Sequence, residues 1–444
     1  MQRGNQTIKL YMLSVNHKLE QVKFKINRLG AITGSEVSLK QFMIFSGESG
    51  VGKSYTAIMC NYLFYSLWSG QRINKFFKDN GISFNDLRLT WKNSGEAFVI
   101  TKEALQNWMH RDIAEFLNYM LGAEVNADID IELPIPEKIV FDYNEELEGL
   151  VDAEDAYLRV SINKVLSYRT KNEDESIDGE SSLAFLLRYY LIRELFGDHA
   201  NYRYNFILPP SRGAVLTETV YPITGLYQSF KNMLDVINQV PPHQDNIEEH
   251  LRDVFRKILD GRVYRDGDKY FYETAGENMG ISAAASSIKE IAPLSLFVNR
   301  FNVSLSNILI EEPEAHLHPL KQRMMADIIA LLVNNSTCVQ ITTHSDYLLR
   351  RINELVMLFN ISEKYQDVFE NLCERMEIPS YLKLDYHSIG AYLLRRRPDN
   401  TVEVICQNTE NGVSFDTFYK ALRVNIDYRR MLENVLDTGE YERG

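Results

Sequence analysis

The residues most clearly suited to chemistry are Gly47-x-x-x-x-Gly52-Lys53-Ser54. This spacing is typical of a phosphate-binding loop, because glycines let backbone N–H groups approach a β-phosphate without a Cβ in the way. Lys53 is expected to reach the β- and γ-phosphates, and the Ser54 hydroxyl to ligate Mg²⁺. The pattern predicts a site for ATP and Mg²⁺. The loop residues around the phosphates are Gly47, Glu48, Ser49, Gly50, Val51, Gly52, Lys53 and Ser54.

The sequence on either side of the loop supports this prediction. The apolar run 42–45 has the composition of a strand, and residues 54 to about 67 have that of a helix. A helix that begins at the loop adds the attraction of its N-terminus for anions. The alternative is a glycine-rich turn before a helix, which the order strand, loop, helix makes much less favourable.

A pair of carboxylates forms the second candidate feature. The apolar residues 307–310 are followed directly by Glu311 and Glu312, as expected for a buried strand that presents two acids at its end. One acid can hold Mg²⁺ and the next can orient the attacking water. Many strands end in acidic residues, so the significance of the pair depends on its neighbours.

Two neighbouring segments complete the pattern. Residues 338–343 predict another short strand, which ends at His344, and this side chain could reach the γ-phosphate. Ser286 and Ser287 stand where a helix should begin, suited to presenting hydroxyl and free N–H groups to a phosphate. The carboxylates lie so far from Lys53 in sequence that a large insertion within the nucleotide-binding domain is expected.

In this order the motifs resemble those of the ABC-type ATPases of the OLD, RecF and SMC group. Ile310-Glu-Glu-Pro-Glu-Ala-His-Leu-His-Pro319 is similar to the form in OLD-like ATPases. So are the phosphate loop followed by Tyr55 and the segment Leu208-Pro-Pro-Ser-Arg-Gly213. The resemblance covers roughly residues 5–60 and 200–350, and through it Tyr55 joins the residues expected to bind the nucleotide.

The resemblance implies a role for each site residue. Lys53 and Ser54 bind phosphate and Mg²⁺. Glu311 is the Walker B acid and a Mg²⁺ ligand, Glu312 is the catalytic base, and His344 is the catalytic switch histidine.

Ser286 and Ser287 resemble the signature segment, which in this family completes the nucleotide site of the opposing subunit. The family usually carries Gly where Ser287 aligns. The resemblance therefore implies a homodimer or a higher homo-oligomer.

The resemblance also implies an α/β fold, namely an ABC-type P-loop ATPase head with a mixed sheet and a helical insertion. The predicted parts are an N-terminal ATPase lobe with the phosphate loop at 1–60, a helical insertion at 61–125, a β-rich return of the lobe at 126–170, a second helical insertion at 182–262, and a C-terminal ATPase lobe with the signature, Walker B and switch histidine at 263–444.

Composition limits the class of protein. The 444 residues are 45% hydrophobic and 25% charged, as in ordinary globular proteins, and the net charge is −13. This acidity disfavours a protein that coats DNA non-specifically, because such binding needs many Lys and Arg contacts. The sequence begins without a signal-peptide core and has no apolar run of membrane-spanning length, so a cytoplasmic protein with no membrane partner is expected.

Each of three further groups of residues has two possible interpretations. Glu314, His316 and His318 could bind a metal, but they more readily shape the turn after Walker B and a dimer contact. Arg212 could act as an arginine finger or form a structural ion pair. Residues 395–397 are all arginine and could bind nucleic acid, although a solvated hairpin end is favoured.

OLD nucleases carry a Toprim nuclease domain after the ATPase, but the residues past His344 are too few for one and lack its acidic pattern. The chain instead resembles stand-alone OLD-like ATPase subunits of bacterial anti-phage systems such as PARIS and Septu. The resemblance implies a sensor or scaffold that controls a separate, nuclease-like effector, with a phage-derived trigger as a further partner.

The alternative function is that of a RecF-like DNA repair ATPase that clamps DNA. Nucleic acid is therefore an open partner class, but it is not the favoured one. The nucleotide subunit of a transporter fits poorly.

Overall fold

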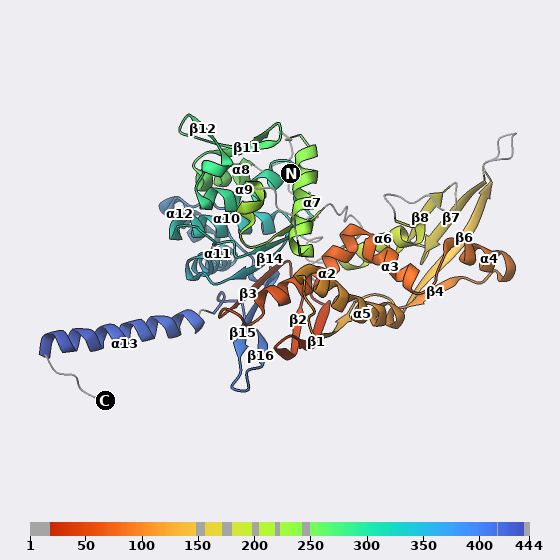
Figure 1. Ribbon diagram of the computed structural model, residues 1–444, viewed down its shortest axis with the longest axis horizontal. Coiled ribbons are helices and arrows are strands. Elements are labelled where there is room, and N and C mark those ends of the chain that lie inside the picture. The colour runs from red at the N-terminus through yellow and green to blue at the C-terminus, as the bar shows by residue number, and fades with distance from the viewer. Residues whose placement is uncertain are drawn as a thin grey trace.

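The computed structural model describes residues 18–147, 156–170, 180–197, 204–217, 223–241, 249–414 and 416–438. The first residues of the predicted N-terminal lobe lie outside this part of the chain. Figure 1 shows an elongated molecule, in which an arm of strands extends from one side of the body and helix α13 (Asp416–Thr438) projects from the other. Among the described helices, none is long and apolar enough to span a bilayer.

A nine-stranded mixed sheet forms the centre of the body. Its inner strands pair in parallel, and the pairs β1–β2, β1–β5 and β15–β16 are antiparallel. This mixed sheet with helices on both faces confirms the predicted α/β class. In spatial order the strands are β5 (Ala127–Glu132), β1 (Lys23–Leu29), β2 (Ile32–Ser38), β16 (Val402–Cys406), β15 (Ile389–Arg396), β3 (Phe42–Gly47), β14 (Cys338–Thr343), β13 (Asn307–Glu311) and β9 (Asn205–Leu208).

Strand β3 shows how the sheet separates two hydrophobic cores. Successive side chains of a strand point to opposite faces. Met43 and Phe45 accordingly join one buried cluster, and Phe42 and Ile44 join the other. Because both faces are covered, the strand is apolar throughout, as is typical of an inner parallel strand.

The first face carries the helices that follow the phosphate loop, and the second carries the helices of the C-terminal half. The first group is α2 (Lys53–Ser69), α3 (Gln71–Asp79), α5 (Lys102–Leu121) and α6 (Ser182–Phe196), whereas α4 (Phe84–Ser94) lies out in the arm (Figure 1). The second group is α7 (Gly225–Gln239), α8 (Glu249–Leu259), α9 (Ser286–Val298), α10 (Pro319–Asn334), α11 (Asp346–Lys364) and α12 (Gln366–Met376).

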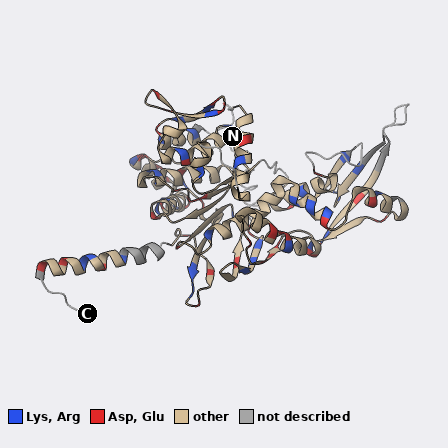
Figure 2. Ribbon diagram, viewed as in Figure 1, with Lys and Arg blue, Asp and Glu red and all other residues tan. Residues whose placement is uncertain are grey.

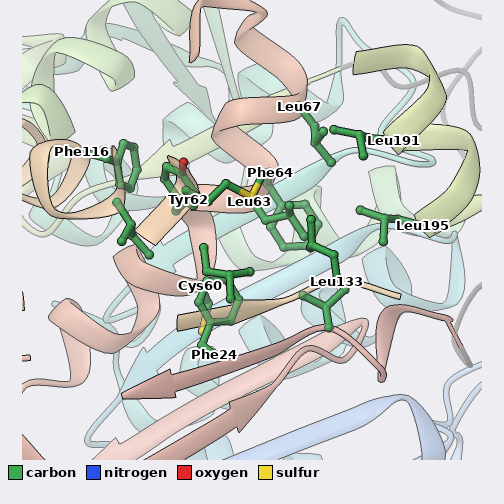
Figure 3. Close-up of a cluster of buried hydrophobic side chains, with 14 of the residues drawn as sticks. Phe24, Cys60, Tyr62, Leu63, Phe64, Leu67, Phe116, Leu133, Leu191 and Leu195 are labelled. Carbon is green, nitrogen blue, oxygen red and sulfur yellow. The ribbon is translucent and has the colours of Figure 1, made fainter. Parts of the chain in front are cut away.

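Helix α2 links the phosphate loop to the first core. Its apolar residues lie on every side, which is typical of a helix surrounded by protein. In Figure 3, Tyr62, Leu63 and Phe64 of α2 lie among Phe116 of α5 and Leu195 of α6. The start of the helix at the loop is therefore fixed by packing along its whole length.

Two smaller sheets differ from the predicted arrangement of the lobes. Of the predicted β-rich return at 126–170, only β5 joins the large sheet. Its other strands, β6 (Lys138–Leu147), β7 (Ala156–Ile162) and β8 (Leu166–Thr170), join β4 (Phe98–Thr101) in a four-stranded sheet in the arm. Strand β4 lies inside the predicted helical insertion at 61–125, and β9, inside the one at 182–262, is an edge strand of the large sheet.

A third sheet contains β10 (Arg262–Asp266), β11 (Lys269–Thr274) and β12 (Glu277–Gly280). It packs beside α8 and α9 rather than joining the large sheet. Apart from these sheets, the division of the chain into lobes and insertions stays a prediction.

Candidate nucleotide site

The phosphate loop turns sharply between β3 and α2 at glycines that other residues could not replace. Gly47 has φ 141°, and a Cβ there would lie 2.4 Å from the carbonyl oxygen of Leu394 on β15. Gly52 has φ 94° and a Cβ there would press on Ile32 of β2. The loop therefore owes its path to close backbone contact with β15 and β2.

Lys53 is the first residue of α2, and its side chain folds back over the loop. Its Nζ donates to the carbonyl oxygens of Glu48 at 2.9 Å and Gly47 at 3.2 Å. Burial lowers the pKa of Lys53 to about 8, while the acids Glu312 and Glu311 oppose this shift. A buried cation held inside the loop is suited to an anionic ligand.

Ser54 and Glu311 meet although they lie 257 positions apart in the chain. The Ser54 hydroxyl donates to Glu311 Oε2 at 2.8 Å, and Thr342 Oγ1 donates to the same oxygen at 2.8 Å. Glu311 is 2% exposed, and its other oxygen, Oε1, is buried without a hydrogen-bond partner in the described structure. A hydroxyl beside a carboxylate with a spare oxygen is a donor set that fits Mg²⁺.

Burial raises the pKa of Glu311, although the hydrogen bonds from Thr342 and Ser54 oppose the change. A charged carboxylate at this position is thus disfavoured by its surroundings. A bound cation would offset that penalty.

Glu312 faces a different environment from Glu311. Its backbone N–H donates to Thr342, and its φ of 46° turns the chain so that successive acids diverge. The Glu312 side chain is 45% exposed, and one of its oxygens lies 3.9 Å from His344 Nε2. Burial lowers the pKa of His344, with Lys53 adding to the effect.

A cavity of about 450 Å³ lies over the phosphate loop. The structure brings together here most of the predicted site residues. The lining residues are Ser49, Gly50, Val51, Gly52, Lys53, Ser54, Tyr55, Glu312 and His344 from the prediction, together with Leu29, Ala31, Ile32 and Thr342. The last four were not predicted. Thr342 lies within the predicted strand 338–343, two residues before His344, and could have been noticed there, whereas nothing local to the turn from β1 to β2 indicates that it reaches the phosphate loop.

Glu314 holds the end of β14 in place. One of its oxygens accepts from Thr343 Oγ1 at 2.9 Å and from the backbone N–H of His344 at 2.6 Å. His318 instead caps α10 by accepting from the Leu320 N–H at 3.4 Å. Within the described ranges no three His, Cys, Asp or Glu side chains form a group that could hold a metal. These contacts favour the interpretation of Glu314 and His318 as residues that shape the local turns.

Arg212 is buried, at 2% exposure, behind the carboxylates. It donates to the backbone oxygens of Glu311 at 2.9 Å, Glu290 at 2.9 Å and Pro209 at 3.2 Å, and it pairs with the Glu290 carboxylate at 3.5 Å. Of the two interpretations, these contacts favour a structural ion pair. Arg212 ties β9, β13 and α9 together beneath the site.

Ser286 and Ser287 lie at the first turn of α9, where a helix start was predicted. Ser286 is exposed and Ser287 half-buried, and neither lines the cavity over the phosphate loop of its own chain. Their predicted role for an opposing subunit stays a prediction.

A family model described as an AAA ATPase domain matches residues 119–349, just over half of the chain. The chain belongs to this family. The matched segment contains Glu311, Glu312 and His344, and the phosphate loop lies before it. The matched ATPase domain therefore contains the part of the site that the C-terminal half of the chain supplies.

This AAA ATPase is also similar in structure to heads of SMC proteins. An SMC head bound to the C-terminal winged-helix domain of ScpA gives a TM-score of 0.39 at 12% identity, covering 88% of this chain and 98% of that one. The SMC head domain from Thermotoga maritima gives a TM-score of 0.31 at 10% identity, covering 87% of this chain and 98% of that one. The Pyrococcus furiosus SMC head with an extended coiled coil, bound to the C-terminal domain of ScpA, gives a TM-score of 0.35 at 10% identity. The match covers 92% of this chain and 99% of that one. A comparison of the sequence with curated proteins gave no match.

Proposed function

We propose that this AAA ATPase binds and hydrolyses ATP with Mg²⁺ at the cavity over its phosphate loop. The observation that carries the proposal is the hydrogen bond from Ser54 to Glu311, which joins the two distant halves of the motif set at 2.8 Å. A serine at the start of a P-loop helix beside a strand-end acid is the arrangement that holds Mg²⁺ in P-loop ATPases.

In this proposal each residue has one task. Ser54 and Glu311 would hold Mg²⁺, which supplies neutralisation of phosphate charge when bound. Lys53 and the backbone N–H groups of the loop bind the phosphates. Glu312, half-exposed on the cavity wall, accepts the proton of the attacking water, and His344 donates a hydrogen bond toward the γ-phosphate.

We further propose that the chain is the sensor or scaffold subunit of a bacterial anti-phage system and controls a separate nuclease-like effector. The resemblance of its motifs to those of OLD-like ATPase subunits is the basis. Exposed apolar side chains on the projecting helix α13 support a protein partner, and they include Tyr428 at 64%, Leu432 at 65% and Leu436 at 83% exposure.

A phage challenge tests this role. Cells would carry the gene with its native neighbours, and matched cells would carry the Lys53→Ala variant or this gene alone. We expect protection only from the parental gene together with its neighbours. Nucleic-acid cleavage by the purified chain alone, with Mg²⁺ or Mn²⁺, would contradict the proposal, and so would ATP-dependent DNA clamping without any protein partner.

A further inference from the structure

A second cavity lies at the far end of α2, away from the phosphate loop, and has a volume of about 250 Å³. Three aromatic residues line it: Tyr65 and Trp68 from the last turns of α2, and Tyr204 at the start of β9. Its other walls come mostly from α7, which lies beside α2 in Figure 1. The remaining lining residues are Ser69, Asn205, Ser229, Asn232, Met233 and Val236.

The lining is aromatic and amide-bearing, and no charged side chain of the described structure contributes to it. Asn232 Oδ1 accepts from Gln228, so both hydrogens of its Nδ2 remain available to a ligand. Asn205 Nδ2 donates one hydrogen to Asn61 and keeps the other. Aromatic faces with amide donors suit a flat, neutral heterocycle that carries acceptors at its edge.

Asn205 also connects the cavity to the sheet beneath α2. Its side-chain oxygen accepts from Asn61 of α2 at 3.1 Å and from Asn307 of β13 at 2.7 Å. Asn61 and Asn307 are fully buried. One amide triad therefore joins the cavity, the helix that follows the phosphate loop and the strand that carries Glu311.

The polar row continues along the same face of the sheet. Asn307 and Glu311 point to the side of β13 that faces α2, and Gln340 and Thr342 point to that side of β14. Several of these atoms are buried without a hydrogen-bond partner within the described ranges, namely Asn307 Oδ1, both amide atoms of Gln340, and Glu311 Oε1. An under-satisfied buried row can change its hydrogen bonds when one member is engaged.

We propose that the cavity between α2 and α7 is a regulatory site for a neutral planar heterocycle of nucleoside size. A ligand stacked there and hydrogen-bonded to Asn205 and Asn232 would alter the amide triad. Through the polar row this change would reach Thr342 and Glu311. The binding itself is independent of the proposed function, whereas its effect on turnover rests on the proposed ATP hydrolysis.

Guanosine is the probe, titrated calorimetrically into the full chain already saturated with Mg²⁺ and ATPγS. We expect one guanosine per chain. Val236→Trp, which fills the cavity, should weaken binding at least tenfold, and Asn232→Ala should weaken it about tenfold through the lost hydrogen bond. Gln239→Trp is the matched control, because it adds the same side chain to α7 outside the cavity, and its affinity should equal that of the parental protein.

A second measurement tests the coupling. Guanosine should change the ATP turnover of the parental chain, and Gln340→Leu should keep guanosine binding but lose that effect. Since neither amide atom of Gln340 has a hydrogen-bond partner among the described residues, this variant is expected to fold.

Four results would overturn the binding site, and a fifth would overturn its regulatory role. The first three are no guanosine binding, equal binding by Val236→Trp, and guanosine binding only when ATPγS is left out. The fourth is binding of N-acetyl-tryptophanamide in place of guanosine, which would indicate an aromatic side chain of a protein partner. Guanosine binding without any change in turnover would overturn the regulatory role.

Discussion

Glu311 and Glu312 are neighbours in sequence with opposite environments. Glu311 is buried and shares one oxygen between Ser54 and Thr342, whereas Glu312 is half-exposed on the cavity beside His344. The turn at Glu312, with φ 46°, produces this difference. These two environments agree with the proposed roles of Glu311 as a cation ligand and Glu312 as a proton acceptor.

Thr342 is the residue that links the two acids, because its hydroxyl donates to Glu311 and its oxygen atoms accept from the Glu312 N–H. Thr342→Val keeps the shape and removes the hydroxyl. We expect the Mg²⁺ concentration needed for nucleotide binding to rise about tenfold, as for one lost hydrogen bond to a charged group. Thr337→Val, another buried threonine distant from the cavity, should leave it unchanged. Equal Mg²⁺ titrations for both variants would contradict this role of Thr342.

The buried ion pair of Arg212 is predicted to stabilise the fold. Arg212→Ala would leave the Glu290 carboxylate buried and unpaired and remove donors from three carbonyl oxygens. The expected loss is about 3–5 kcal/mol in the free energy of unfolding, measured by urea denaturation. Arg262→Ala breaks an exposed pair with Glu273 and should cost about 0–1 kcal/mol. Similar losses for the two variants would show that Arg212 is not a structural ion pair.

At the scale of elements, the loop and β15 depend on each other. Gly47→Ala would place a Cβ 2.4 Å from the Leu394 carbonyl oxygen, so loop and strand could not keep their contact. Gly34→Ala meets nothing within 4 Å, although its φ of 55° is also positive. It should therefore show only the backbone strain, about 1–2 kcal/mol. We expect Gly47→Ala to lose far more thermal stability and to lose nucleotide binding. Equal melting temperatures would contradict the steric argument.

The sequence could predict the elements whose signal is local. The glycine spacing located the loop, and the apolar runs located β13 and β14. Pairing between distant segments has no such signal. For this reason the placement of β9 at the edge of the large sheet and of β6, β7 and β8 in the arm could not be predicted.

The site shows the same limit. The motif residues Lys53 and Glu312 could be proposed from their types and spacing, and the structure places both on the cavity. Leu29 and Ile32 line the cavity only because β1 and β2, which lie four and three strands from β3 in the sheet, turn toward the loop. Likewise, the choice between two roles for Arg212 depended on contacts to segments far from it in sequence.

At the scale of the whole molecule, the structure has acidic and basic residues distributed over the body and arm, as Figure 2 shows. The apolar side chains exposed along α13 are therefore more distinctive than any charge pattern. A molecule with one protruding amphipathic helix is suited to assembly with another chain.

The composite site is a prediction at this scale, because Ser286 and Ser287 do not line the cavity of their own chain. Mixed dimers would combine a Lys53→Ala subunit with a subunit that carries Ser286→Trp and Ser287→Trp. We expect each variant alone to be inactive and the mixture to recover part of the ATP turnover, since one composite site is intact. No recovery in dimers verified by mass photometry would count against the arrangement.

In the proposed mechanism Glu312 activates the attacking water, Lys53 holds the phosphates, and Ser54 and Glu311 hold Mg²⁺. The most direct measurement combines ATP binding by calorimetry with single-turnover hydrolysis for Glu312→Gln and Lys53→Ala. We expect Glu312→Gln to bind ATP and Mg²⁺ like the parental chain and to hydrolyse ATP at least 100-fold more slowly, about the effect of losing a general base. Lys53→Ala should lose binding itself. Parental hydrolysis by either variant would contradict the account.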